Sequence, residues 1–218
     1  MLRELFSTLV IASTMTTAAT AEPPAVKAMA DPQMGDHWTY AKRDEITGKT
    51  QGTLTQAVTE VQGDDVSVRG SWQGTTSTWL VTFDRQWNVK ENLPFHFLPN
   101  DGMGIRTPLA VGQTWTADAK KMNMKGEQPV WSLSRTVTVV GRSTVTTKAG
   151  QFDAFEIVHS NRGENVPNSG VVQEDVTRTW YVPEINHWVK RVRETRMNGY
   201  LTSKTSDELV EYGRREGN

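Results

Sequence analysis

Two arginines stand in rows of the sequence that are otherwise apolar. Every second residue of the stretch 131–139 gives Trp131, Leu133, Arg135, Val137 and Val139. The same spacing in 174–182 gives Val176, Arg178, Trp180 and Val182. Alternate residues of a β-strand share one face of a sheet, so we expect both arginines on a largely apolar face. Because charged side chains are rarely buried without a partner, each arginine should bind an acidic side chain or an anion.

A third stretch supplies a suitable carboxylate, since Glu156 shares a row with Phe152, Ala154 and Val158. One interpretation is an internal ion pair, or arginine stems that reach out to the rim of the sheet. The other is an apolar groove with an arginine at its mouth, which suits a fatty-acyl or other amphipathic ligand with a carboxylate or phosphate. The candidate ligand-binding residues are Arg135, Arg178, Glu156, Trp131, Trp180, Phe95 and Phe97.

The remaining polar residues form no recognisable catalytic or metal-binding motif. The four histidines have neither i,i+2 nor i,i+4 spacing, which argues against a metal site. No serine lies in a Gly-x-Ser-x-Gly motif, and no glycine-rich phosphate loop is present. The adjacent carboxylates Asp64 and Asp65, like Glu174 and Asp175, would point to opposite faces of a strand. We therefore predict a protein that is not an enzyme, with no catalytic residue, no metal and no cofactor.

The elements that must position these residues are β-strands. Beyond Asp36 the sequence is rich in Thr, Val and Trp, with apolar and polar residues alternating and no long stripe of helical period. Short connections favour antiparallel pairing. We predict an all-β fold with few short helices: an antiparallel curved sheet, or half-barrel, built of two β-meanders. The main expected strands are 36–42, 52–61, 65–72, 78–83, 87–91, 131–139, 142–148, 152–159, 174–182, 187–196 and 205–212.

A short sequence motif that occurs twice suggests where the two meanders divide. The residues around Trp38, Gly-Asp-His-Trp-Thr, return around Trp115 as Gly-Gln-Thr-Trp-Thr. We therefore expect a single domain, 36–214, with halves at about 36–91 and 112–212. The connector 92–111 is rich in proline and glycine yet unusually apolar for a surface loop, so we expect it to cover something.

The N-terminus is typical of an export signal. Arg3 precedes an apolar stretch, and Ala19-Thr20-Ala21 forms a small-x-small cleavage site, so we expect a signal peptide at 1–21. A flexible arm, 22–35, should follow it. No later stretch reaches the ~20 apolar residues of a membrane helix. These features predict export to a bacterial periplasm, with cleavage near Ala21 and no transmembrane segment in the mature chain.

The amino-acid composition limits the classes of binding partner that we expect. The 218 residues include 24 Lys and Arg against 25 Asp and Glu, for a formal net charge of −1. Such a balance offers no general attraction to nucleic acid, so we expect no nucleic-acid partner. The sequence has no cysteine, which excludes disulfides, thiol nucleophiles and a lipid-modified cysteine.

Three motifs together resemble a known family. They are Gly-Gln-Thr-Trp at 112–115, Ala-Gly-Gln-Phe-Asp-Ala-Phe at 149–155, and the segment 179–190, Thr-Trp-Tyr-Val-Pro-Glu-Ile-Asn-His-Trp-Val-Lys. In this order the chain resembles the TapB-like family of exported bacterial proteins of unknown function. The resemblance implies an exported antiparallel β fold similar to the half-barrel of periplasmic lipoprotein carriers such as LolA, and it carries over no catalytic residue.

Two functions follow from these observations. The first is a non-enzymatic periplasmic binding or carrier module for an amphipathic, lipid-like ligand or envelope component. The alternative is a protein–protein interaction or assembly factor of the cell envelope, which would dock an envelope protein through sheet edges or a polar sheet face. The two differ in where the apolar surface lies, which is inside a groove for the carrier and along an exposed edge for the docking module.

Overall fold

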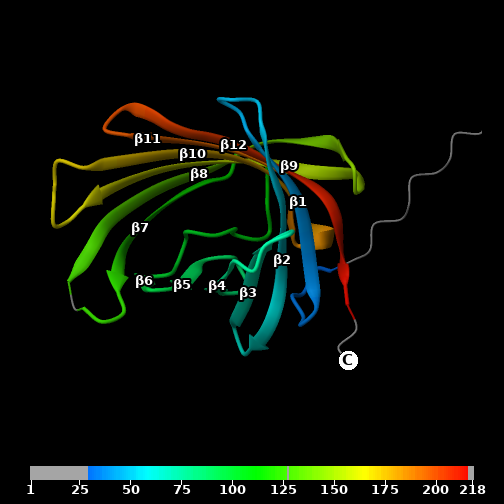
Figure 1. The fold of residues 1–218 in the computed structure, drawn as a ribbon, viewed down its shortest axis with the longest axis horizontal. Coiled ribbons are helices and arrows are strands. Elements are labelled where there is room, and N and C mark those ends of the chain that lie inside the picture. Colours follow the sequence, from blue (N-terminus) through cyan, green and yellow to red (C-terminus); the bar gives the residue numbers. More distant parts are fainter. Residues whose placement is uncertain (1–28, 127, 216–218) are drawn as a thin grey trace, which may run out of the picture.

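The computed structural model describes residues 29–126 and 128–215, which form a barrel of antiparallel strands (Figure 1). Within these ranges the chain begins with β1 (Asp36–Asp44), β2 (Thr50–Gln62), β3 (Asp65–Trp72), β4 (Thr78–Phe83), β5 (Val89–Asn92) and β6 (Phe95–Leu98). It continues with β7 (Thr114–Asn123), β8 (Pro129–Thr147), β9 (Gly150–Asn165), β10 (Val172–Val182), β11 (His187–Met197) and β12 (Tyr200–Arg214). A turn of 3₁₀-helix, η1 (Pro183–Ile185), joins β10 to β11.

Each strand pairs with its neighbour in the sequence, and β12 returns to pair with β1. That closing pair runs along all of β1, from Asp36 opposite Arg214 to Asp44 opposite Thr205. The all-β class and the antiparallel pairing are confirmed for the described residues. The half-barrel is wrong, because the β1–β12 pair closes the sheet on itself. The division into two meanders is also wrong, since one uninterrupted meander makes the whole barrel.

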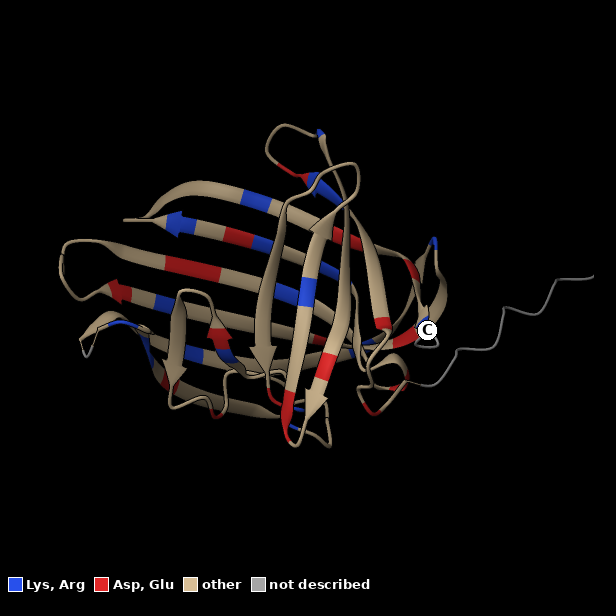
Figure 2. Ribbon diagram, turned by 60° about the horizontal axis from the view of Figure 1, so that its bottom comes forward, with Lys and Arg blue, Asp and Glu red and all other residues tan. Residues whose placement is uncertain are grey.

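The two walls of the barrel differ in strand length. β8 has 19 residues and β9 has 16, whereas β5 and β6 have four each. In Figure 1 the strands β7 to β11 reach past β5 and β6 on the left. Four turns follow one another there, at 93–94, 124–128, 166–171 and 198–199, and we call this the long-strand end. Figure 2 shows positive and negative residues interspersed along the long strands, in keeping with the balanced composition.

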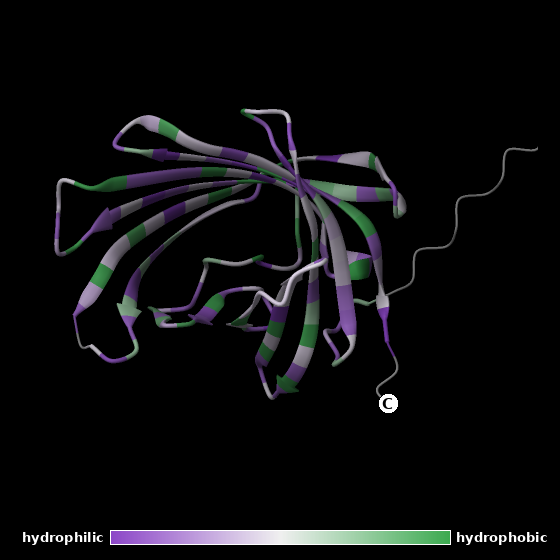
Figure 3. Cartoon of the chain, in the orientation of Figure 1, coloured by the Kyte–Doolittle hydropathy of each residue, from purple (hydrophilic) through white to green (hydrophobic). Residues whose placement is uncertain are grey.

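The core consists of two clusters of buried apolar side chains. One packs around Trp38 and Ile185 beside η1, and the other is built on Trp115, Val137 and Ile157. The alternation that indicated strands in the sequence is visible in Figure 3 as hydrophobic and hydrophilic bands that succeed one another along the strands. Aromatic and β-branched side chains therefore fill part of the barrel from the inward-facing positions.

The expected connector 92–111 is partly strand and partly inside the barrel. Its first residues belong to β5 and β6, and the loop that follows carries the buried side chains of Met103 and Ile105. The Ile105 N–H donates to the carbonyl of Gln86 at 2.6 Å. A Cβ at Gly104 would lie 2.1 Å from that same carbonyl oxygen, so the close approach requires glycine. This loop therefore packs against the interior of the barrel rather than over its surface.

The structure describes only the last part of the N-terminal region, from residue 29 onward. The expected signal peptide, 1–21, lies outside the described residues, as does most of the expected arm. Within the arm's described part, Met29 is buried and its N–H donates to the carbonyl of Glu184 at 2.6 Å, whereas Met34 is exposed. In the part of the chain that is described, no helix is both long enough and apolar enough to span a membrane.

Candidate ligand-binding cavity

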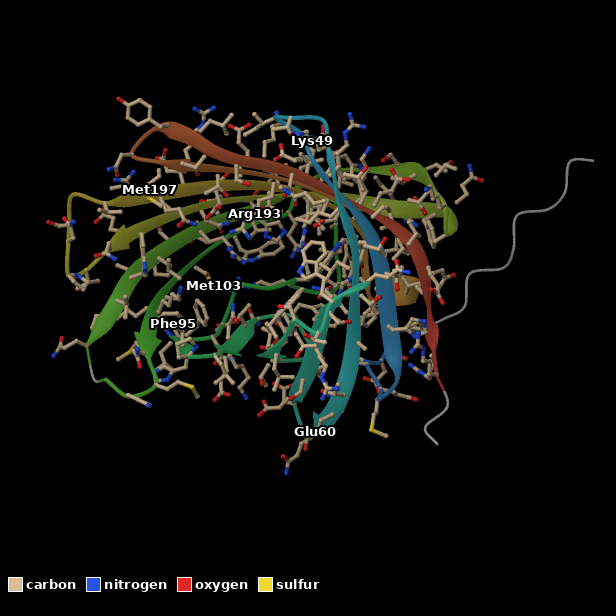
Figure 4. All side chains as sticks on the ribbon, in the orientation of Figure 1. Lys49, Glu60, Phe95, Met103, Arg193 and Met197 are labelled. Atoms are coloured by element: carbon tan, nitrogen blue, oxygen red, sulfur yellow. The ribbon has the colours of Figure 1, made fainter. Side chains whose placement is uncertain are left out.

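The aromatic core and the inward loop leave a cavity of about 390 Å³ inside the barrel. Its apolar lining consists of Val89, Phe97, Met103, Trp131 and Leu133. Its polar lining consists of Lys121, Arg135, Asn161, Gln173, Asp175 and Arg193, and Gly163 completes the wall. In Figure 4, Arg193, Met103 and Phe95 succeed one another from the long strands toward β6. The cavity is therefore amphipathic, with charged groups and large apolar side chains facing the same space.

Arg135 reaches this cavity because it shares the inward face of β8 with Leu133 and the fully buried Val137. Its Nε donates to the Asn161 Oδ1, and its Nη1 donates to the Met103 carbonyl. Burial, aided by the positive charge of Arg193, lowers the pKa of Arg135 to about 10, which leaves the guanidinium charged at neutral pH. These two contacts use two of the five N–H donors of the guanidinium, so others remain for a ligand.

Asp175 is a buried carboxylate whose oxygens are engaged by its neighbours. Arg193 donates to Oδ1 from Nη2 at 3.1 Å, and the Thr195 hydroxyl donates to the same oxygen at 2.6 Å. The Gln173 amide donates to Oδ2 at 2.7 Å. A carboxylate held by several donors is stable in a low-dielectric site. Asp175 therefore fixes Arg193 at the cavity wall and neutralises one of the positive charges there.

Lys121 brings a third cation to the cavity. It pairs across the β7–β8 ladder with Trp131, and its Nζ lies 4.0 Å from the centroid of the Phe95 ring. Burial lowers the pKa of this lysine. An ammonium over an aromatic face is stabilised by the ring quadrupole while it keeps donors free for another partner.

The charges of the lining do not balance. Three cations, Lys121, Arg135 and Arg193, face a single carboxylate, Asp175, which leaves an excess of two positive charges. Guanidinium groups bind carboxylates and phosphates by paired hydrogen bonds, and the apolar lining offers a surface for hydrocarbon. The arrangement can therefore hold a molecule that has an acidic head and an apolar body.

A second hollow lies on the outer face of the long strands, with a volume of about 670 Å³. Hydroxyl groups and charged residues line it, and four of its charged side chains pair with one another: Arg162 lies 3.2 Å from Glu174, and Arg196 lies 2.8 Å from Glu194. Val176 is the one large aliphatic side chain of its described lining. The interior cavity is therefore the better candidate for an amphipathic ligand.

The ligand-binding residues predicted from the sequence fall into two groups in the structure, one at the cavity and one away from it. Arg135, Trp131 and Phe97 line the cavity, and Phe95 stands beside it under Lys121. Arg178 and Glu156 form an ion pair with each other outside the cavity lining, with half of the Arg178 side chain exposed. Trp180 is half-buried, and the Lys190 Nζ lies 5.3 Å from the centroid of its ring. The structure thus brings Arg135, Trp131, Phe97 and Phe95 together and places the other three elsewhere.

The rows predicted on β9 and β10 lie largely on the outward face of the barrel. On β10 the cavity residues are Gln173 and Asp175, so Arg178, which has the opposite parity, faces away from the cavity. On β9 the buried residues change parity between Ala154 and Ile157, opposite a β-bulge in the neighbouring strand β8. Phe152 therefore points into the core, while Glu156 does not.

Several of the cavity residues are not among those predicted from the sequence. Arg193 shares the inward parity of Val189 and could have been found by the same alternation that marked Arg135. Lys121 and Asp175 carry no such signal, because each stands among other charged or polar residues. Met103 enters the site from a loop, whose path no strand periodicity predicts.

The buried titratable groups beyond the cavity serve the core. His187 stacks on Trp38 with ring centroids 4.1 Å apart, and its Nδ1 is hydrogen-bonded to the Tyr40 hydroxyl. Burial lowers the pKa of His187 and raises that of Tyr40. Residues 29–126 and 128–215 contain no group of three or more His, Asp or Glu side chains placed to hold a metal ion.

Comparisons with known proteins bear on the fold. No protein-family model matches the sequence, and no curated protein is similar enough in sequence to match it. An exported protein of Bacteroides fragilis, described as having a YmcC-like fold, superposes with a TM-score of 0.50 at 14% identity, over 84% of this chain and 98% of that one. The barrel therefore resembles the YmcC-like fold.

Two further structures are similar at lower scores. A Parabacteroides distasonis protein described as a lipoprotein gives a TM-score of 0.49 at 14% identity, covering 85% of this chain and 99% of its own. The hypothetical lipoprotein YmcC of Escherichia coli gives 0.47 at 9% identity, covering 81% and 84%. Neither the TapB-like name nor the likeness to LolA is confirmed by these comparisons.

Proposed function

We propose that this chain is an exported, non-enzymatic protein of the bacterial envelope that binds an amphipathic anionic ligand inside its barrel. The observation that carries the proposal is the interior cavity, where Arg135, Arg193 and Lys121 face the same space as Trp131 and Phe97. An acidic head would accept hydrogen bonds from the guanidinium groups, and an apolar chain would lie along the aromatic wall.

The size of the cavity supports a ligand with one chain. Its volume of about 390 Å³ lies toward the lower end of the roughly 300–1,000 Å³ that is typical of small-molecule sites. The inward loop limits the space on one side, since the Met103 carbonyl accepts a hydrogen bond from Arg135. A single acyl chain with a carboxylate or phosphate therefore suits the site better than a lipid with two chains.

The envelope location rests on two supports. The sequence begins with a segment typical of a signal peptide, and the Bacteroides fragilis protein with the similar fold is described as exported. The alternative of an assembly factor that docks by strand addition loses its simplest route, because the described strands close into a barrel and leave no free edge.

The test is binding of a fluorescent fatty acid, cis-parinaric acid, and of its uncharged methyl ester. Arg135→Met removes a charged donor from the cavity at similar length, whereas Arg178→Met removes an arginine whose partner is Glu156 outside it. A hydrogen bond to a charged group contributes about 1.5–3 kcal/mol, so Arg135→Met should weaken acid binding by roughly ten- to a hundredfold. The ester should bind both variants as it binds the original protein.

Two results would overturn the proposal. One is absence of binding of either probe by the unaltered protein. The other is equal binding of the acid by Arg135→Met and Arg178→Met. Arg135→Lys, which keeps the charge, serves as a second variant and should retain part of the affinity for the acid. Near-ultraviolet circular dichroism of each variant checks that the Met103 loop remains in place.

A further inference from the structure

The long-strand end carries large apolar side chains that the fold leaves in solvent. Leu93 is 59% exposed, Val166 is 44% exposed and Tyr200 is 79% exposed, and Met124 and Leu201 are each 42% exposed. They lie in or directly beside four successive turns. Backbone hydrogen bonds tie these turns to their neighbours: the Met124 N–H donates to the Pro94 carbonyl at 3.0 Å. The apolar tips therefore stand along one edge of the barrel.

These side chains protrude from separate hairpins instead of forming one flat patch. The backbone around them is partly engaged in hydrogen bonds, since the Asn198 N–H donates to the Val172 carbonyl at 2.8 Å and the Asn198 side chain accepts from the Val172 N–H at 2.7 Å. Hydrogen bonds within the turns lower the cost of bringing these apolar tips into a lipid interface. Tyrosine, here Tyr200, favours the boundary between hydrocarbon and water.

The charges of this edge suit a bilayer. Among the described residues of the four turns Lys125 is the one charged side chain, so the tips carry little charge. The strand that leads into the second turn brings Lys120 and Lys121 close behind the tips. Such an arrangement places apolar groups outermost and cations at the depth of lipid headgroups, where anionic lipids attract them.

Part of the cavity lining lies next to the same edge. Its lining residue Trp131 pairs with Asn165, the last residue of β9, and Gln173 pairs with Met197, the last residue of β11. Both pairs lie next to the turns that bear Val166 and Tyr200. We propose that the long-strand end docks on a lipid bilayer surface and inserts its apolar tips, so that the cavity faces the lipid from which its ligand comes.

Vesicle flotation tests this surface separately from the ligand site. The unaltered protein should float with vesicles of phosphatidylethanolamine and phosphatidylglycerol. A variant with Leu93→Glu, Val166→Glu and Leu201→Glu should lose at least about tenfold in vesicle affinity, because three inserted apolar groups become charged. The matched control carries Met34→Glu, Val111→Glu and Val140→Glu, which are exposed apolar positions away from this edge. It should float like the unaltered protein.

The proposal is overturned if the unaltered protein does not float, or if the two triple variants float equally. It is also overturned if the first variant merely converts a dimer to a monomer in light scattering, since the edge would then be an interface between copies of this chain. The ligand site fails independently: the long-strand variant should still bind cis-parinaric acid without vesicles, and Arg135→Met should still float.

Discussion

Replacing Asp207 with asparagine removes the charge that holds two cations inside the barrel. The Asp207 Oδ1 lies 2.9 Å from the Lys42 Nζ, and its Oδ2 lies 2.7 Å from the Arg191 Nη2. Removing one partner of a buried ion pair costs about 3–5 kcal/mol. The Lys42 and Arg191 side chains retain 19% and 27% exposure, so we expect the lower bound, about 3 kcal/mol. For a domain of this size that is a fall in Tm of roughly 6–12 °C.

The assay is urea unfolding at neutral pH, with Asp153→Asn as the matched control. Asp153 makes a similar contact, 2.7 Å from the Arg142 Nη2, but both side chains are more than half exposed. An exposed pair contributes about 0–1 kcal/mol, so the control should unfold almost like the unaltered protein. If the two variants lose the same stability, the buried ion pairs of Asp207 contribute no more to the stability of the fold than an exposed pair does.

The same variant has a definite pH dependence. Burial by itself would raise the pKa of Asp207, but the charges of Arg191 and Lys42 outweigh it and lower the pKa below its usual value. A carboxyl with a lowered pKa stabilises the fold above its unfolded-state pKa, near ~3.9, and this contribution is lost as the pH falls through the folded-state pKa. The gap between the original protein and Asp207→Asn should therefore shrink below about pH 4.

Two further predictions concern the loop and the buried histidine. Gly104→Ala would place a Cβ 2.1 Å from the Gln86 carbonyl and should destabilise the protein by about 1–3 kcal/mol in urea unfolding, whereas Gly141→Ala, with open space around its Cβ, should leave stability within about 0.5 kcal/mol. Equal effects of these two substitutions would contradict the close packing of the loop. Burial, with Arg135 and Arg191 nearby, lowers the pKa of His159 to about 3, so its imidazole NMR signals should not titrate between about pH 5 and pH 8. A midpoint near the usual histidine value would show that this side chain is solvated.

The class of the fold could be predicted from the sequence, but closure of the sheet could not. Alternating residues such as Leu133, Arg135 and Val137 identify a strand and its inward face because the period of a strand is local. Closure depends on the pairing of Asp36 with Arg214, 178 positions apart, and no local pattern encodes which edges meet. Within that fold, the expected Arg135 and Trp131 do line the cavity, as their shared parity required.

The rest of the site depended on features that periodicity does not report. The buried row of β9 changes parity between Ala154 and Ile157, with no proline or glycine between them to mark it, and so Glu156 and Arg178 meet outside the cavity. The path of the loop around Met103 is set by contacts with Gln86 and Arg135, which are distant in the chain. Changes of strand parity and the paths of inward loops are determined by tertiary contacts. The alternation in the sequence could therefore identify only part of the cavity lining.

The central claim is that the barrel holds an anionic amphiphile, and native mass spectrometry of the protein purified from the cells that produce it tests this claim most directly. We expect a fraction of the protein to carry a bound single-chain acid, which solvent extraction releases and which the Arg135→Met variant does not carry. Protein that carries no amphiphile, and that takes up none when fatty acid is added, would contradict the account.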